Sequence, residues 1–126
     1  MLVARPKLQR RPVHGVLLLD KPIGLSSHDA LYQVKRLFRA EKAGHTGTLD
    51  PLATGLLPLC FGAATKFSHV SLDADKSYRA TLHLGQVRVG GDLEGEVTHE
   101  RPVSFDRAAL DAAVLRLRGE IEQVPP

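Results

Sequence analysis

The chain has 126 residues, of which 43% are hydrophobic and 25% are charged, and its formal net charge is +3. These values are typical of a single globular domain and exclude a chain that is disordered throughout, while the single Cys60 excludes an internal disulfide. The charge is uneven: residues 1–70 hold ten Lys or Arg against four Asp or Glu, so this part is expected either to face a polyanion or to be ordinary solvated surface.

Residues 1–13 are predicted to form a basic N-terminal arm. They lack the long apolar run of a secretory signal, and no other run approaches the roughly 18 apolar residues that span a membrane. We therefore expect a cytoplasmic protein with no membrane partner. The apolar run 15–22 predicts a buried strand that ends in a turn. Ser26, with Asp29 three residues later, predicts the start of a helix.

Residues 43–55 are rich in Gly, Thr and Pro and are predicted to form an ordered loop. The run 55–62 predicts a second buried strand, which Pro58 confines to a sheet edge or a bulge. A short helix is expected over residues 64–72. The alternation of apolar and polar residues in 78–85 predicts a half-buried strand.

The last part of the chain predicts a hairpin and a helix. A turn-rich stretch at 90–95 leads into a strand at 96–100, and Ser104 or Asp106 caps a helix that ends near Gly119. Because helices and strands follow no regular βα alternation, we expect an α+β fold in which helices pack on a sheet.

The loop that begins at Gly44 reads GHTGTLDPLATG and carries the groups best suited to chemistry. Its glycines permit close approach of a ligand, and its hydroxyl, imidazole and carboxylate groups supply polar contacts. Asp50 precedes Pro51, so from the residues alone it is either a reactive carboxylate or the first residue of a β-turn. The loop lacks the Gly-Lys-Ser/Thr of a phosphate-binding P-loop. The histidines and Cys60 show no paired metal-ligand spacing, so we expect no metal site.

Four segments of the chain carry recognisable motifs: GVLLLDKPIGLSS (15–27), AGHTGTLDPLATGLLPLCFGAATKF (43–67), DKSYRATLHLGQ (75–86) and RGEIEQVPP (118–126). In their order and approximate spacing they resemble the bacterial TruB family of tRNA pseudouridine synthases. The resemblance implies that residues 14–126 form the N-terminal part of a pseudouridine synthase catalytic domain, with an α+β fold in which helices flank a mixed, largely antiparallel sheet. It also implies that the C-terminal half of this domain and an RNA-binding domain are absent.

The resemblance further implies an activity, the isomerisation of the uridine at position 55 in the T-loop of tRNA to pseudouridine. The reaction needs no cofactor or metal, and Asp50 is the catalytic nucleophile. His45 and Tyr78 match residues that bind the substrate, although a loop-ordering hydrogen bond for His45 and a core position for Tyr78 are alternatives. Further residues that match supporting positions are Lys21, Gly44, Thr46, Gly47 and Lys66.

Two other functions stay open from the sequence: a truncated, non-catalytic tRNA-binding or tRNA-folding module, and a purely structural α+β fragment. The expected partner is tRNA, through its T-arm and T-loop. The oligomeric state is open, with a monomer expected if the chain is complete.

As an isolated chain, this polypeptide is expected to be inactive or strongly impaired. In the family an arginine from the second half of the domain stabilises the aspartate, and the strands of that half cover surface that would otherwise be exposed and apolar. In addition, the loop Val87–Asp92 departs from the polar sequence common in the family, which puts its geometry in question.

Overall fold

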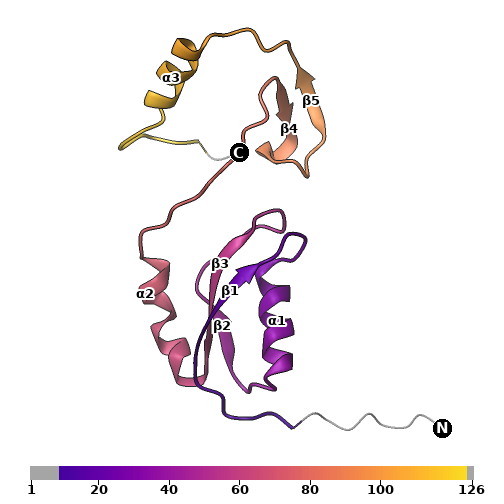
Figure 1. The fold of residues 1–126 in the computed structure, drawn as a ribbon, viewed down its shortest axis with the longest axis vertical. Helices are drawn as coiled ribbons and strands as arrows, with labels where there is room; N and C mark the ends of the chain where they lie inside the picture. The colour runs from indigo at the N-terminus through magenta and orange to yellow at the C-terminus, as the bar shows by residue number, and fades with distance from the viewer. Residues whose placement is uncertain (1–8, 125–126) are drawn as a thin grey trace, which may run out of the picture. The chain divides into compact units, whose positions relative to one another are not determined.

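The computed structural model describes residues 9–124, and the chain divides into two compact units, Met1–Ser77 and Tyr78–Pro126 (Figure 1). Of the predicted arm 1–13, residues 1–8 lie outside the described residues. Arg11 is tied to the first unit: its N–H donates a hydrogen bond to the Arg39 carbonyl oxygen (2.8 Å), and its own carbonyl oxygen accepts one from the Glu41 N–H (3.1 Å).

The first unit is built on a three-stranded antiparallel sheet. Its strands are β1 (Gly15–Lys21), β2 (Ala43–His45) and β3 (Gly55–Phe61), in the spatial order β1-β3-β2. The strands predicted over 15–22 and 55–62 are confirmed, and so is the α+β class with antiparallel pairing. The prediction of an unbroken loop over 43–55 is wrong at its start, because the first three residues pair with β3 as β2.

Pro58 lies in the central strand, so the prediction of an edge or bulge is wrong. In an antiparallel ladder the N–H and C=O of one residue face the same neighbouring strand. The Pro58 carbonyl oxygen accepts a hydrogen bond from the Thr46 N–H (3.1 Å), just after β2 ends at His45. An N–H at position 58 would therefore face Thr46, which lies just after β2. Its absence in proline removes no hydrogen bond from β2 itself.

Helix α1 (Ser27–Leu37) begins where Ser26 and Asp29 predict. The Ser26 hydroxyl accepts a hydrogen bond from the Asp29 N–H (3.0 Å) and donates one to the Asp29 carboxylate (2.6 Å). The first of these bonds satisfies an N–H group that the first helical turn leaves unpaired. One face of the helix packs on the sheet, and the buried core between them consists of Ala30, Leu31, Ala40, Leu57, Leu59 and Phe61.

The other face of the sheet carries exposed apolar side chains. Along β1, Leu17 and Leu19 pack against the core, whereas Val16 and Leu18 are 60% and 66% exposed. The prediction of a buried strand is therefore only half right for β1, because its run of apolar residues covers both faces and the core occupies one. This agrees with the exposed apolar face expected from the sequence.

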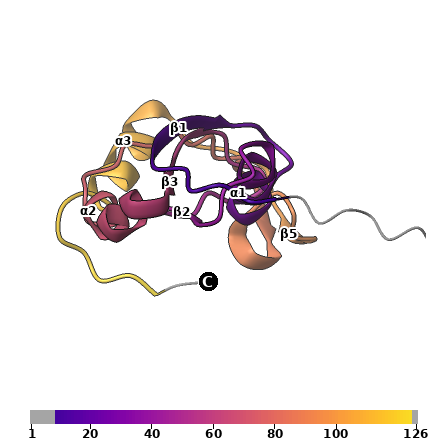
Figure 2. The ribbon, with the colours of Figure 1, turned by 90° about the horizontal axis from the view of Figure 1, so that it is seen from below.

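The short helix predicted over 64–72 is present in two pieces. A 3₁₀ helix, η1 (Gly62–Phe67), leads directly into α2 (Ser68–Leu72). In both views α2 and α1 lie on opposite sides of the sheet (Figures 1 and 2). No helix within residues 9–124 is long and apolar enough to cross a membrane.

The second unit contains a short hairpin and one helix. The elements are β4 (Gln86–Arg88), the 3₁₀ turn η2 (Val89–Gly91), β5 (Val97–Glu100) and α3 (Arg107–Leu115). The predicted strand at 96–100 and the start of the helix capped by Asp106 are confirmed, with the Asp106 carboxylate accepting from the Ala109 N–H at 2.8 Å. The helix ends at Leu115, before the predicted end near Gly119.

The strand predicted over 78–85 is wrong. Those residues have no strand structure, and β5 pairs with Gln86–Arg88 instead. An alternating segment becomes a strand only if another strand pairs with it. Nothing within residues 78–124 is fully buried, so this unit offers the segment no apolar layer to pack on.

Candidate active site

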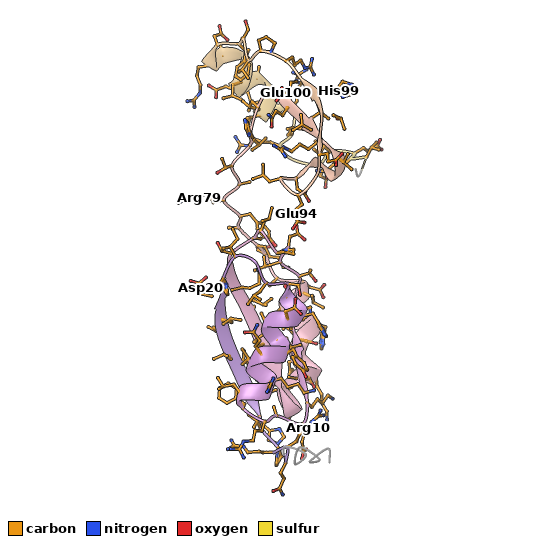
Figure 3. All side chains as sticks on the ribbon, turned by 90° about the vertical axis from the view of Figure 1, so that its right-hand side faces the viewer. Arg10, Asp20, Arg79, Glu94, His99 and Glu100 are labelled. Carbon is orange, nitrogen blue, oxygen red and sulfur yellow. The ribbon has the colours of Figure 1, made fainter. Side chains whose placement is uncertain are left out.

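The Asp50 loop, residues 46–54, lies at one end of the three-stranded sheet. It leaves β2 after His45 and enters β3 at Gly55, which pairs with Lys21 at the end of β1. The turn that follows β1 therefore lies at the same end. Figure 3 shows Asp20, the neighbour of Lys21, and Arg10 at opposite ends of the first unit.

Asp50 begins a β-turn and presents its side chain to solvent. Its carbonyl oxygen accepts a hydrogen bond from the Ala53 N–H (3.0 Å), so the turn alternative is correct for the backbone. The residue is exposed, and within residues 9–124 no hydrogen bond or ion pair engages its carboxylate. A turn in the backbone and a reactive role for the side chain are compatible, because the turn uses only main-chain atoms.

The neighbours of Asp50 are fixed on both sides. The Leu49 side chain packs against the hydrophobic core, and its N–H donates a hydrogen bond to the Ser27 hydroxyl (2.8 Å). The Pro51 carbonyl oxygen accepts from the Gly24 N–H (2.7 Å). An exposed carboxylate on a fixed backbone has the form required of a nucleophile or a stabiliser of developing charge. Sequence reasoning missed Ser27 and Gly24 as parts of this site.

Lys21, predicted as a supporting residue, is fully buried at 0% exposure. Its Nζ donates hydrogen bonds to the carbonyl oxygens of Pro22 (3.0 Å) and Leu25 (2.5 Å). Buried polar groups need such partners, and here the partners are the backbone of the turn between β1 and α1. Lys21 thus shapes the turn that contains Gly24.

The predicted residues before Asp50 lie along the end of β2 and the start of the loop. Gly44 and His45 belong to β2, and Thr46 is buried with its backbone bonded to Pro58. His45 Nδ1 contacts the Gly47 carbonyl oxygen at 2.6 Å, so the loop-ordering hydrogen bond considered for His45 is present.

The other two predicted residues lie outside this loop in the sequence. Lys66 is exposed on η1, which follows the Phe61 end of β3, and the seven residues of β3 span about 20 Å. Tyr78 is the first residue of the second unit and is 72% exposed, so the alternative of a core position is wrong.

The altered loop Val87–Asp92 contains an organising arginine. Arg88 donates hydrogen bonds to the Gly95 carbonyl oxygen and to the Gln86 side chain, each at 3.0 Å. Arg88 thus supplies a fork of N–H donors that closes the β4–β5 hairpin on itself.

No three His, Cys, Asp or Glu side chains within residues 9–124 are grouped so as to hold a metal ion. A shallow hollow lies on the outer side of α1, toward its C-terminus, and none of the predicted site residues lines it. Its lining residues are Gln33, Arg36, Leu37 and Arg39.

An α+β unit that presents a carboxylate on a fixed loop indicates an enzyme that uses this carboxylate as a nucleophile or to stabilise developing charge. Comparison with known proteins identifies the family. Residues 35–126 match the profile described as "TruB family pseudouridylate synthase (N terminal domain)". The chain belongs to the TruB family of pseudouridylate synthases.

Similar proteins are named tRNA pseudouridine synthase B. The one from Cupriavidus pinatubonensis (strain JMP 134 / LMG 1197) is 73% identical over 121 residues, which is 96% of this chain and 38% of the relative. The one from Burkholderia lata is 66% identical over 122 residues, or 97% of this chain and 38% of the relative. The chain thus spans 38% of the length of these relatives.

Solved structures also resemble part of the chain. A structure of an H/ACA RNP bound to a substrate RNA containing 2'-deoxyuridine matches with 44% sequence identity and a TM-score of 0.44, over 45% of this chain and 18% of that chain. A Cbf5-Nop10-Gar1 complex matches with 33% identity and a TM-score of 0.42, over 51% of this chain and 24% of that chain.

Proposed function

We propose that the chain carries the catalytic aspartate of an enzyme that converts uridine to pseudouridine in tRNA, with Asp50 as the nucleophile. Its membership of the TruB family and its relatives named tRNA pseudouridine synthase B support this proposal. The observation that carries it is the presentation of Asp50: an exposed carboxylate on a backbone held at Leu49 and at Pro51.

The chemistry matches one fixed carboxylate. In the proposed reaction the bond from N1 of uracil to C1′ of ribose breaks, a bond from C5 to C1′ forms, C5 loses a proton and N1 gains one. Substrate and product are isomers, so the overall reaction needs no oxidant or reductant, and the proposed reaction uses no cofactor or metal. A nucleophile that holds the intermediate divides one difficult step into two easier ones.

The proposed substrate is the uridine at position 55 in the T-loop of tRNA. A base inside a folded RNA must leave its stack to reach the carboxylate. His45, at the start of the loop, is proposed to contact the RNA, and Tyr78 to stack on the extruded base. The excess of Lys and Arg in residues 1–70 favours binding of a polyanion.

The experiment uses a fusion protein in which residues 1–126 are followed by the part of the Cupriavidus pinatubonensis relative that lies beyond the matched region. An unmodified tRNA T-arm is the substrate, and pseudouridine is mapped by mass spectrometry. Asp50→Asn removes the charge of the carboxylate with almost no change in size. Asp20→Asn is the matched control, because Asp20 is also exposed and lies outside the loop.

Loss of pseudouridine formation in Asp50→Asn alone, with tRNA binding retained, is the expected result. Full activity of Asp50→Asn would refute the proposal. Binding of tRNA by the wild-type fusion without any product would refute it as well, in favour of the non-catalytic tRNA-binding module.

A further inference from the structure

The segment that leads into α1 holds the backbone next to Asp50. The Ser27 hydroxyl accepts a hydrogen bond from the Leu49 N–H (2.8 Å) and donates one to the Leu49 carbonyl oxygen (3.1 Å). These residues are 22 positions apart in the sequence. Beyond Asp50, the Gly24 N–H bonds to the Pro51 carbonyl oxygen (2.7 Å). The proposed nucleophile thus lies between two anchored residues.

The helix itself does not require the Ser27 hydroxyl. Capping of the helix falls to Ser26, whose hydroxyl accepts from the Asp29 N–H. Ser27 follows it as the first helical residue, a position at which many residue types are tolerated. Ser27 is nevertheless buried at 2% exposure, and within residues 9–124 both hydrogen bonds of its hydroxyl go to Leu49. The two adjacent serines therefore have different tasks: Ser26 starts the helix and Ser27 holds the loop.

We infer that Ser27 is a positioning residue: its hydroxyl fixes the backbone of Leu49 and thereby sets the position of the Asp50 carboxylate. This inference rests on the proposed function. A hydroxyl both donates and accepts, so one small side chain makes the two bonds to Leu49 that a paired strand would otherwise make. Misplacement of a reacting group by about 1 Å costs on the order of 100-fold in rate, so the loss of this anchor acts on the chemical step.

The test measures kcat and KM for Ser27→Ala, Ser27→Thr and Ser68→Ala in the fusion protein. Ser68 is the matched control, because its hydroxyl donates to a local carbonyl oxygen, that of Thr65 (3.1 Å), at the start of α2. We expect Ser27→Ala to lower kcat by about 10- to 100-fold while KM changes little. Ser27→Thr keeps the hydroxyl and is expected to recover most of the loss, and Ser68→Ala to behave like the wild type.

Equal kcat values for Ser27→Ala and Ser68→Ala would overturn the inference. A fall in kcat that only follows the loss of folded protein, measured by circular dichroism, would also overturn it. If Ser27→Ala does not fold, amide hydrogen exchange of the wild-type chain decides. Slow exchange of the Leu49 N–H is expected, and exchange as fast as in an unstructured peptide contradicts the anchor.

Asp50→Asn is measured in the same series so that the two proposals fail separately. Activity retained in Asp50→Asn refutes the proposed function. An inactive Asp50→Asn together with a fully active Ser27→Ala refutes only the positioning role of Ser27.

Discussion

The ring nitrogen Nδ1 of His45 lies 2.6 Å from the carbonyl oxygen of Gly47. A carbonyl oxygen only accepts hydrogen bonds, so Nδ1 carries the proton in this contact. In the neutral ring this leaves Nε2 as an acceptor that is not used by the Gly47 contact. The side chain closes the first residues of the Asp50 loop onto their own backbone and still offers one nitrogen to a ligand.

The bond between His45 and Gly47 is expected to stabilise the chain measurably. His45→Ala and His45→Phe both remove the donor, and Phe retains a ring of similar size. We expect each variant to lower the free energy of unfolding by about 1 kcal/mol in urea denaturation, the usual worth of one hydrogen bond. If His45→Phe were as stable as the wild type, the ring would contribute by packing alone.

A side chain at position 47 is expected to destabilise the chain because of the backbone conformation there, and not because space is lacking. The φ of Gly47 is +132°, which residues other than glycine rarely adopt, although nothing lies within 4 Å of an added Cβ. We expect Gly47→Ala to destabilise the chain by about 1–3 kcal/mol through backbone strain. Gly44→Ala is the control, since Gly44 also has open space but no positive φ, and its stability is expected to stay the same or rise slightly. Equal stability of both variants would contradict the strain.

Lys21 is expected to support the turn beside the site through its two hydrogen bonds. Lys21→Met keeps an unbranched side chain but leaves the carbonyl oxygens of Pro22 and Leu25 without this donor. We expect a loss of about 1–3 kcal/mol in the free energy of unfolding. Lys66→Met, the same change at an exposed position, is expected to alter it by less than about 0.5 kcal/mol. Similar losses in both variants would show that burial of Lys21 does not matter.

Arg39 is expected to sit in a strained conformation at the end of α1. Its φ is +52°, in the left-handed region where glycine commonly ends helices. We expect Arg39→Gly to raise the free energy of unfolding by about 1 kcal/mol. Arg36→Gly, within α1, is expected to lower it by about as much.

Each of the two arginine variants removes one positive charge. Filter binding to tRNA at several salt concentrations therefore measures the effect of the lost charge separately from the effect of backbone strain on stability. Both are expected to weaken binding to a similar degree if the two guanidinium groups contact phosphates. A destabilised Arg39→Gly would show that the left-handed backbone carries no strain.

Local signals in the sequence were sufficient for β1, β3 and the start of α1 in the first unit. The cap formed by Ser26 and Asp29 and the apolar runs of β1 and β3 act within a few residues, so their pattern predicts the elements correctly. The segment 78–85 has an equally clear alternation, but a strand also requires a partner, and the pattern of one segment does not supply it.

The candidate loop could be picked out from the sequence, but the residues that anchor it could not. Polar groups and glycines around Asp50 marked the loop without any structure. The bond from Ser27 to Leu49 crosses 22 residues, and no spacing rule links two such positions. The pair Ser26-Ser27 was the one local indication of this anchor. A helix cap needs only one hydroxyl, so the second was free for another contact.

Pro58 lies opposite Thr46, the first residue of the Asp50 loop. With an N–H at position 58, a residue could pair fully with Thr46, and β2 could continue toward Asp50 and take residues from the loop. Proline leaves Thr46 with a single backbone bond and stops the ladder at His45. The proline within the central strand therefore lies where β2 ends, and the residues between β2 and β3 form the irregular backbone that turns at Asp50.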